Sequence, residues 1–317
     1  MRGVFEAKPI ADLDVLPVAP ETLRRGAGET PLRGFVSDFA ESKVALGGCA
    51  LLLCIVVAAA LAPWIAPQNP YDLGAISILD SRLPPGAESS DGMTFWLGTD
   101  SMGRDMLSAI LYGLRISLGV GITSGVIAVG IGLCVGLLAA YFGGAVDTLI
   151  MRVVDLQLSF PAILVALILL AVLGTGIDKI IVALVVVQWA YYTRTVRASA
   201  LVERRREYVE AAICLALGTR RVLFRHMLPN VLPPLIVVAT VQVAHAITLE
   251  ATLSFLGLGL PITEPSLGLL IANGFEYMLS GKYWISFFPG IALLVTIVSI
   301  NLVGDRLRDV LNPRLQR

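Results

Sequence analysis

Long uncharged apolar segments are the dominant feature of the sequence. The first runs from Val44 to Ile65, 22 residues without a charged side chain. As a helix rising 1.5 Å per residue, it is long enough to cross the ~30 Å hydrocarbon layer of a bilayer. The chain is 56% hydrophobic and 15% charged, whereas soluble domains carry about 25% charged residues. These segments exclude an ordinary soluble protein and predict an all-α polytopic membrane protein.

Six segments are predicted to span the membrane. The second is rich in glycine at four-residue spacing, which allows close helix approach in lipid. The third contains Pro161, which should kink it. The apolar stretch 251–275, interrupted by glycine and proline, is expected to form surface loops or a partial re-entrant turn. The predicted spans are residues 44–65, 116–141, 153–173, 178–198, 231–250 and 284–304.

Two units are predicted along the chain, a tail at residues 1–43 and a transmembrane domain at residues 44–317. The prolines and mixed charge of the tail predict a mostly irregular segment. Residues 34–43 are expected to form a short amphipathic helix at the membrane surface. Seven acidic residues precede the first span, whereas a signal peptide needs a short basic start, so the tail is expected to be retained.

Basic residues are distributed unequally among the loops. The chain has 24 basic and 24 acidic residues, and this zero net charge argues against a nucleic-acid partner. With both termini in the cytoplasm, 19 basic residues lie on the cytoplasmic side and 5 on the other. Since positive charge accumulates in cytoplasmic loops, this division predicts that both termini are cytoplasmic.

The most basic loop, residues 194–230, has an unusual organisation for a linker. Two helix-forming stretches, Leu201–Leu217 and Arg220–Leu228, flank Gly218, and Pro229 is expected to close the second. Such a pair of helices can project as a rigid knob that docks into a groove of another protein. The alternative is an interfacial connector whose arginines bind anionic lipid headgroups. The expected apolar tip consists of Ala211, Ala212, Ile213 and Leu215.

Part of this loop resembles a known motif. Glu210–Ala212, with Leu228 and Pro229 at the end of the segment, resembles the EAA loop of bacterial ATP-binding-cassette (ABC) importer permeases. In that family the loop forms a coupling helix that sits in a cleft of the ATPase subunit. The usual glycine position of the motif holds Ala216, and the nearest glycine is Gly218. Because alanine is unfavourable at positive φ, either the turn is helical or it has moved to Gly218.

Further blocks resemble the C-type permease subunits of dipeptide, oligopeptide and nickel importers. They are residues 96–118, 226–230, 253–259 and 301–314, in that order. The resemblance implies the type I ABC importer permease fold, with six transmembrane helices and a cytoplasmic coupling helix. It also implies a multi-pass protein of the bacterial inner membrane. The implied partners are a second homologous permease subunit, two ABC ATPase subunits and an extracytoplasmic solute-binding protein.

A polar turn precedes the second span. It is expected either to bond to itself and cap that span, or to contact the arriving binding protein. Its residues are Gly98, Thr99, Asp100, Gly103, Arg104 and Asp105.

Few ionisable residues lie at membrane depth. Asp155 follows Arg152 by three residues, which predicts an ion pair between them. His245 and Glu250 are candidates either to line a water-filled path or to face a neighbouring helix. The two histidines lack the neighbours of a zinc site, and the chain has no Walker A or catalytic motif. We therefore expect no enzyme activity, metal or cofactor in this chain, with ATP and Mg used by the partner ATPases.

The expected function is that of a membrane subunit of an ATP-driven, binding-protein-dependent importer for di- or oligopeptides, forming half of the translocation path. The same importer class for glutathione, a nickel complex or an opine is an alternative. A secondary carrier and a membrane scaffold or receptor subunit are further alternatives. The sequence has neither a row of titrating carboxylates nor a clear inverted repeat, which argues against a carrier.

Overall fold

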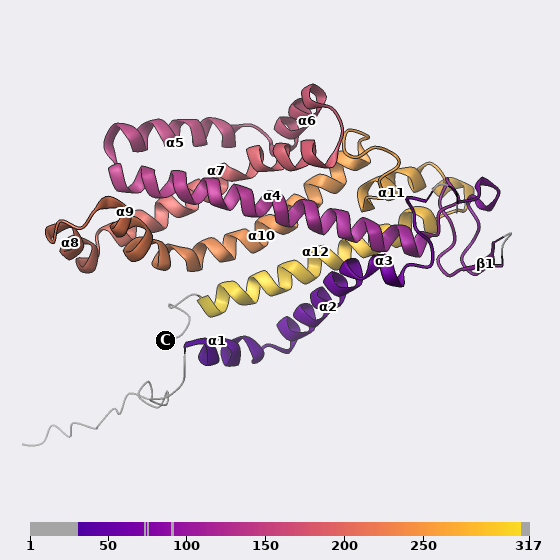
Figure 1. Ribbon diagram of the computed structural model, residues 1–317, viewed down its shortest axis with the longest axis horizontal. Coiled ribbons are helices and arrows are strands. Elements are labelled where there is room, and N and C mark those ends of the chain that lie inside the picture. Colours follow the sequence, from indigo (N-terminus) through magenta and orange to yellow (C-terminus); the bar gives the residue numbers. More distant parts are fainter. Residues whose placement is uncertain (1–30, 73, 75, 90–91, 312–317) are drawn as a thin grey trace, which may run out of the picture.

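Long helices lying side by side form an elongated bundle in the computed structural model (Figure 1), which describes residues 31–311 except 73, 75, 90 and 91. Most of the N-terminal tail therefore lies outside the described residues, and so do residues 312–314, the end of the last sequence block that resembles the permease family. The long helices are α2 (Lys43–Ala60), α4 (Met106–Phe142), α7 (Ile177–Arg204), α10 (Leu228–Phe255) and α12 (Trp284–Leu311). The shorter elements are α1 (Pro31–Ala40), α3 (Ala62–Ile65), β1 (Ala87–Glu88), β2 (Thr94–Phe95), α5 (Gly144–Ser159), α6 (Ala162–Leu173), α8 (Glu207–Cys214), α9 (Thr219–Arg221) and α11 (Leu267–Phe275).

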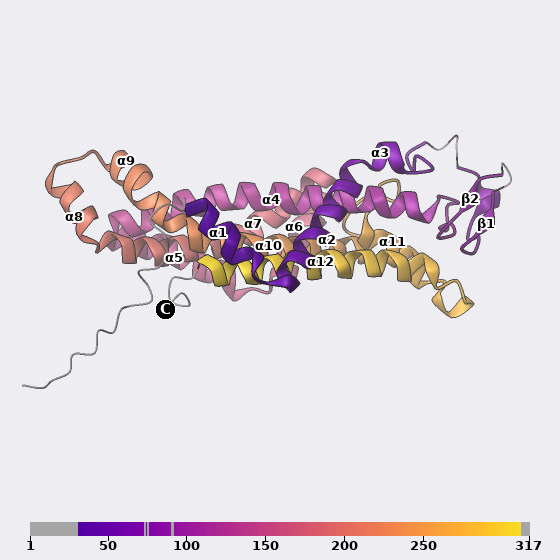
Figure 2. The ribbon, with the colours of Figure 1, turned by 90° about the horizontal axis from the view of Figure 1, so that it is seen from below.

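The bundle has two different ends (Figures 1 and 2). One end, here called the knob end, carries α8 and α9 and lies toward α1 and the last turns of α12. The other, the turn end, carries α3, the antiparallel β1–β2 pair and the start of α4. Because α1 and the end of α12 lie toward the same end, the described chain traverses the bundle an even number of times. This arrangement agrees with the even number of spans expected from the sequence.

The number of membrane-crossing helices is four or five by length and composition among the described residues. The four are α2, α4, the continuous helix Thr219–Phe255 and α12, and the bent pair of α5 and α6 makes a fifth. The remaining long helix, α7, has 28 residues and would reach about 42 Å. It is not among those four because charged residues near both of its ends and a polar middle lower its hydropathy. The all-α class is confirmed, and the count of six stays a prediction.

The helix α4 begins earlier than the sequence predicted. Its first residue is Met106, ten positions before the expected start at residue 116. The carboxylate of Asp105 accepts a hydrogen bond from the backbone N–H of Ser108 at 2.8 Å and so caps the helix. The span was predicted to begin after the charged Arg115, but this residue lies inside the helix.

Ion pairs join α5 to α7 and overturn one local prediction. Asp155 is bonded to Arg194 of α7 at 2.6 Å, so the expected pair with Arg152 is wrong. The carboxylate of Asp147 binds the guanidinium of Arg197 through two hydrogen bonds. These cross-helix partners explain why α5 extends back to Gly144 through residues too polar to be counted as part of a span.

The third predicted span is broken rather than kinked. The helices α5 and α6 meet at an angle of 90° around Phe160 and Pro161. Pro161 lacks an N–H and disfavours a helical residue before it. The side-chain amide of Gln157 donates to the carbonyl of Val186 at 2.8 Å and holds the end of α5 against α7. The predicted effect of the proline is confirmed and is larger than expected.

The stretch 251–275 is a loop only in its middle part, residues 256–266, and the expectation of loops fails at both of its ends. Its first five residues continue α10 to Phe255, and its last nine form α11, which packs against α12, α10 and α4. A Cβ added at Gly268 would lie 2.2 Å from the carbonyl oxygen of Ala251, and one at Gly274 would lie 2.4 Å from the backbone nitrogen of Ser286. These glycines allow a backbone contact that hydropathy does not reveal.

Glycines of α4 also make close helix contacts in the bundle core. A Cβ added at Gly121 would lie 2.7 Å from Cγ1 of Ile247 on α10, and one at Gly136 would lie 2.8 Å from the carbonyl oxygen of Thr193 on α7. The helices α4 and α7 share the most extensive contact of any pair. The predicted close approach at the four-residue glycine spacing is therefore confirmed.

Replacing Gly132 tests this contact. A methyl group there would lie 2.4 Å from Cβ of Tyr192. We expect Gly132→Ala to lower the stability of the purified protein by about 1–3 kcal/mol, as overpacking does, measured as a fall in the Tm of the protein in detergent. The matched control is Gly130→Ala, because nothing lies within 4 Å of the added Cβ. Equal melting temperatures for the two variants would contradict the close contact.

Candidate functional site

The α8 helix projects at the knob end and has two different faces (Figure 1). Val209 and Ala212 are buried against the bundle in a cluster that includes Val222 and Met227. The opposite face is open to solvent, and it includes Glu210, Ala211, Ile213 and Leu215. Ala212 therefore belongs to the base of the knob. The prediction that it forms part of the apolar tip is wrong. Because side chains rotate around a helix axis, Ala212 faces the bundle while Glu210 and Ala211 face solvent.

The turn after α8 lies at Ala216. Its φ is 52°, in the left-handed region, whereas Gly218 has an extended backbone with φ −58° and ψ 141°. The backbone N–H of Leu217 donates to the carbonyl of Ala212 at 3.2 Å, and that of Ala216 to the carbonyl of Ile213 at 2.9 Å. These two bonds form a Schellman motif, which normally has glycine at the left-handed position. The turn has thus kept the position of the family's glycine and has not moved to Gly218.

Three side chains fasten the knob to the bundle. The Nδ2 of Asn230 donates to the hydroxyl of Tyr208 at 2.8 Å, and this hydroxyl donates to the carboxylate of Glu203 at 2.5 Å. Burial and the bond to Glu203 raise the pKa of Tyr208 above its usual value, which keeps the phenol protonated. The chain of bonds joins the end of α7, α8 and the start of α10. The sequence did not reveal this chain of bonds, because Asn230 lies 22 residues after Tyr208 and no motif connects the two.

Pro229 does not end a helix, contrary to the prediction. It lies in the first turn of α10, which continues without interruption from a π turn at Val222–Met227. Proline has no N–H to donate to the preceding turn, and the hydrogen-bond ladder is already irregular in the π turn directly before it. The Nδ2 of Asn230 donates to the carbonyl of His226 at 3.2 Å and satisfies one backbone acceptor beside the proline.

Basic residues line an open hollow beside the knob. It measures about 700 Å³ and is lined by Arg220, Arg221, Arg225 and Phe224, among others. The acidic residues Glu207 and Glu210 lie in the first turn of α8, where the helix dipole favours negative charge. The knob therefore presents an acidic and apolar tip beside a basic hollow.

The polar turn at the other end is buried and bonded to itself. Asp100 and Arg104 are each 1% exposed and form an ion pair at 2.7 Å. The second carboxylate oxygen of Asp100 accepts the backbone N–H groups of Met102 and Arg104 at 2.8 and 3.0 Å. Gly98 and Gly103 have φ values of 78° and 85°, so the turn requires residues without a Cβ.

This turn links several elements. The hydroxyl of Thr99 donates to the carbonyl of Asp80 at 2.6 Å, and its own carbonyl accepts the indole N–H of Trp284 at 3.2 Å. The backbone N–H of Asp105 donates to Gln68 at 2.7 Å. Because these side chains are buried, they hold the turn end together and are not available to a partner. The exposed apolar side chains at this end include Ile78, Leu79, Trp96, Met278 and Leu279.

The two expected path residues lie in different surroundings. Glu250 is fully buried and accepts hydrogen bonds from Ser117 of α4 and Ser254, each at 2.8 Å. It therefore faces neighbouring helices. His245 is exposed and lines a cavity of about 410 Å³ between α6, α7 and α10, here called the midspan cavity. The sequence missed Gln188, which also lines this cavity, because a single uncharged amide in an apolar segment carries no motif.

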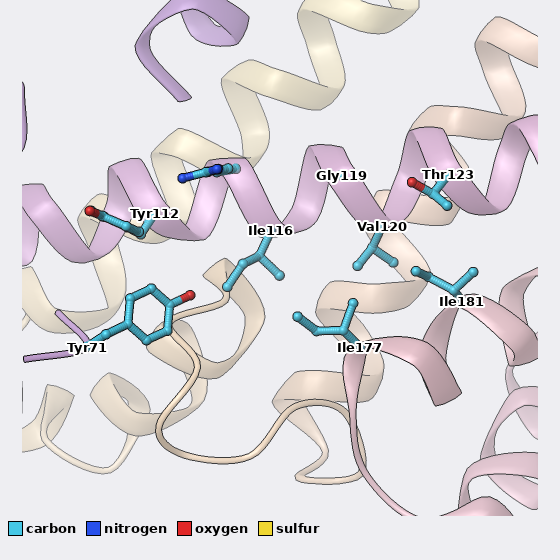
Figure 3. Close-up of a pocket in the computed structure, with 9 residues that line it drawn as sticks. Tyr71, Tyr112, Ile116, Gly119, Val120, Thr123, Ile177 and Ile181 are labelled. Carbon is cyan, nitrogen blue, oxygen red and sulfur yellow. The ribbon is translucent and has the colours of Figure 1, made fainter. Parts of the chain in front are cut away.

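A second cavity of about 330 Å³ lies beside α4 toward the turn end (Figure 3). The rings of Tyr71 and Tyr112 meet edge to face, with centroids 5.5 Å apart. The hydroxyl of Tyr71 donates to Glu264 at 2.9 Å, and burial together with this bond raises the pKa of Tyr71. Arg115 contributes a guanidinium, and Ile177 supplies part of the apolar wall.

Among the described residues, no group of three or more His, Cys, Asp and Glu side chains is arranged to hold a metal ion. The fold and the site together define a helical membrane protein with a short helix that projects at one end. The chain belongs to the family of binding-protein-dependent transport system inner membrane components, whose family model matches residues 132–317. The N-terminal transmembrane domain of oligopeptide transport permease C matches residues 30–85.

Relatives support the same assignment. The chain is 39% identical over 288 residues to the di/tripeptide transport system permease protein DppC of Pseudomonas aeruginosa, covering 90% of this chain and 93% of that protein. It is 40% identical to the dipeptide transport system permease protein DppC of Escherichia coli K12, covering 91% and 95%. A putative peptide transport system permease protein of Brucella suis is 44% identical, covering 85% and 87%. The chain is thus a permease subunit of an ABC importer, as the resemblance predicted.

A solved structure shows the same fold. The MetNI methionine ABC transporter in an inward-facing conformation matches with a TM-score of 0.54 and 22% identity, covering 67% of this chain and 100% of that chain. The likeness confirms the type I ABC importer permease fold for this part of the chain.

The left-handed alanine gives a prediction about the knob. An L-residue other than glycine costs about 1–2 kcal/mol in this conformation. We expect Ala216→Gly to stabilise the knob by about 1 kcal/mol and to slow amide hydrogen exchange in α8 about fivefold. Gly218→Ala is the control, because Gly218 has a φ of −58° and nothing lies within 4 Å of an added Cβ. Unchanged exchange in Ala216→Gly would show that Ala216 does not constrain the turn.

Proposed function

We propose that this permease subunit carries di- or oligopeptides across the membrane and forms half of the translocation path. The names of the relatives that cover most of the chain support the peptide substrate. The observation that carries the coupling role is the knob, because α8 exposes Glu210 and Ala211 while its base is fixed to α7 and α10. A rigid projection of this kind suits transmission of movement between two subunits.

The mechanism is alternating access driven from the knob end. Closure of two ATPase subunits pushes α8, and Val209 and Ala212 pass the movement to the buried cluster at its base. The connected helices α7 and α10 then rock as rigid bodies, which opens the path on the turn end. Hydrolysis returns them to the inward-open arrangement. The residues assigned to ATPase coupling are Glu210, Ala211, Ala212, Ala216, Gly218, Leu228 and Pro229.

The proposed complex contains this chain, a second homologous permease, two ABC ATPases and an extracytoplasmic binding protein. ATP and Mg act in the ATPase subunits, and this chain performs no chemical step itself. The 19-to-5 division of basic residues supports cytoplasmic termini, which puts the knob end in the cytoplasm. The binding protein then meets the turn end, where Leu79, Trp96 and Leu279 are exposed. The buried polar turn supports that surface from within.

Changing the exposed tip tests the coupling role. We expect Glu210→Ala and Ala211→Trp to reduce uptake of a labelled dipeptide more than tenfold in cells expressing the complete transporter. The bulky indole would block the docking cleft, while the amount of this subunit in the membrane stays unchanged. The control is Asp309→Ala, which removes an exposed carboxylate near the end of α12, outside α8 and away from the turn end. Normal uptake by both tip variants would exclude coupling through α8.

The substrate is tested by purifying the complete complex with its binding protein and identifying the bound cargo by mass spectrometry. A peptide would support the proposal. Glutathione, a nickel complex or an opine in its place would keep the importer class and overturn the substrate. Uptake by this chain alone in vesicles would instead indicate a secondary carrier.

A further inference from the structure

The midspan cavity has a chemical character that the neighbouring helix surfaces lack. It lies near the middle of α7 and along the second half of α10, at the start of α6. Six of its lining residues are polar, although they belong to strongly apolar helices. They are Gln188, Tyr191, Gln242, His245, Thr248 and Thr252.

One polar group in this cavity is buried without a partner. The side chain of Gln188 is 3% exposed, and its Oε1 accepts no hydrogen bond from the described residues. Buried amide oxygens are nearly always hydrogen-bonded, and one left unpaired is unfavourable. An occupant that donates an N–H would satisfy this oxygen.

The remaining groups offer both donors and acceptors. The hydroxyls of Thr248 and Thr252 donate to carbonyls one turn earlier on α10, at 2.9 and 2.8 Å, which leaves their oxygens as acceptors. The phenol of Tyr191 and the side-chain amide of Gln242 supply donors. An occupant that carries both N–H and C=O groups would therefore find partners in this lining.

The lining contains no fixed charge. None of its residues is Asp, Glu, Lys or Arg, and His245 is the one basic side chain among them, so the lining has no carboxylate that would select an ammonium group. The volume of about 410 Å³ falls within the range of small-ligand sites. Neutral amides in an apolar wall match the backbone of a peptide better than its ends.

We propose that the midspan cavity is a subsite for the peptide backbone in transit, in which Gln188 and Thr248 accept N–H groups of the cargo. This inference rests on the proposed peptide substrate. Recognition of the backbone alone would allow peptides of different sequence to pass. Sites at mid-membrane depth between helices are where transporters generally hold their substrates.

The first test separates cargo binding from folding. In the complete transporter in proteoliposomes, Thr248→Val and Gln188→Leu keep side-chain size and remove an acceptor. We expect each to lower the number of labelled dipeptides imported per ATP hydrolysed about tenfold, while the ATPase rate stays within twofold of wild type. The control is Thr240→Val on the same helix, which removes the same kind of bond, from Thr240 to the carbonyl of Ile236, outside the cavity. Wild-type coupling in both cavity variants would overturn the subsite.

The second test detects occupancy directly. The four native cysteines, all exposed, are first replaced by alanine. We expect the dipeptide during ATP turnover to slow alkylation of Thr248→Cys at least threefold and to leave Thr240→Cys unaffected. Equal alkylation of Thr248→Cys with and without peptide would overturn the inference. A Thr248→Cys thiol that never reacts would also overturn it, because the second permease would then fill the cavity. If the wild-type transporter imports no dipeptide at all, the proposed substrate fails instead.

Discussion

Backbone contact between α4 and its two neighbours is the constraint on which the rest of the structure depends. Glycines on α4 let α7 approach on one side and α10 on the other, and a methyl group at these positions would displace either helix. The same two helices are joined by the knob at one end and face each other across the midspan cavity. A contact that fixes α7 and α10 therefore fixes both the coupling element and the proposed peptide path.

The two ends of the bundle use different chemistry for the same task. At the turn end, a buried ion pair and several backbone bonds hold loops that have little regular structure. At the knob end, small apolar residues and a chain of three polar side chains fix a short helix. Truncating one member of a buried ion pair leaves an uncompensated charge and is strongly destabilising, whereas the bonds at the knob lie in exposed surroundings.

The sequence predicted what depends on composition and local spacing. Apolar length identified the helices, and glycine spacing identified the face of α4 that meets its neighbours. Partners distant along the chain were not accessible, so Asp155 was assigned to Arg152 when its partner is Arg194. The packed helix α11 was read as loop because glycine and proline break a hydropathy pattern without showing what the backbone touches. At Ala216 propensity disfavoured the left-handed turn, and two backbone bonds outweighed it.

The π turn before α10 determines how that helix is rotated about its own axis. Each residue of a helix advances the side chains by about 100°, so the extra residue of a π turn changes the phase of everything that follows. His245 and Thr248 face the midspan cavity only in the present phase. A one-residue deletion within Val222–Met227 would leave the composition of α10 intact and turn its polar stripe away from α7. The irregular turn beside the knob thus sets which side chains of α10 line the midspan cavity.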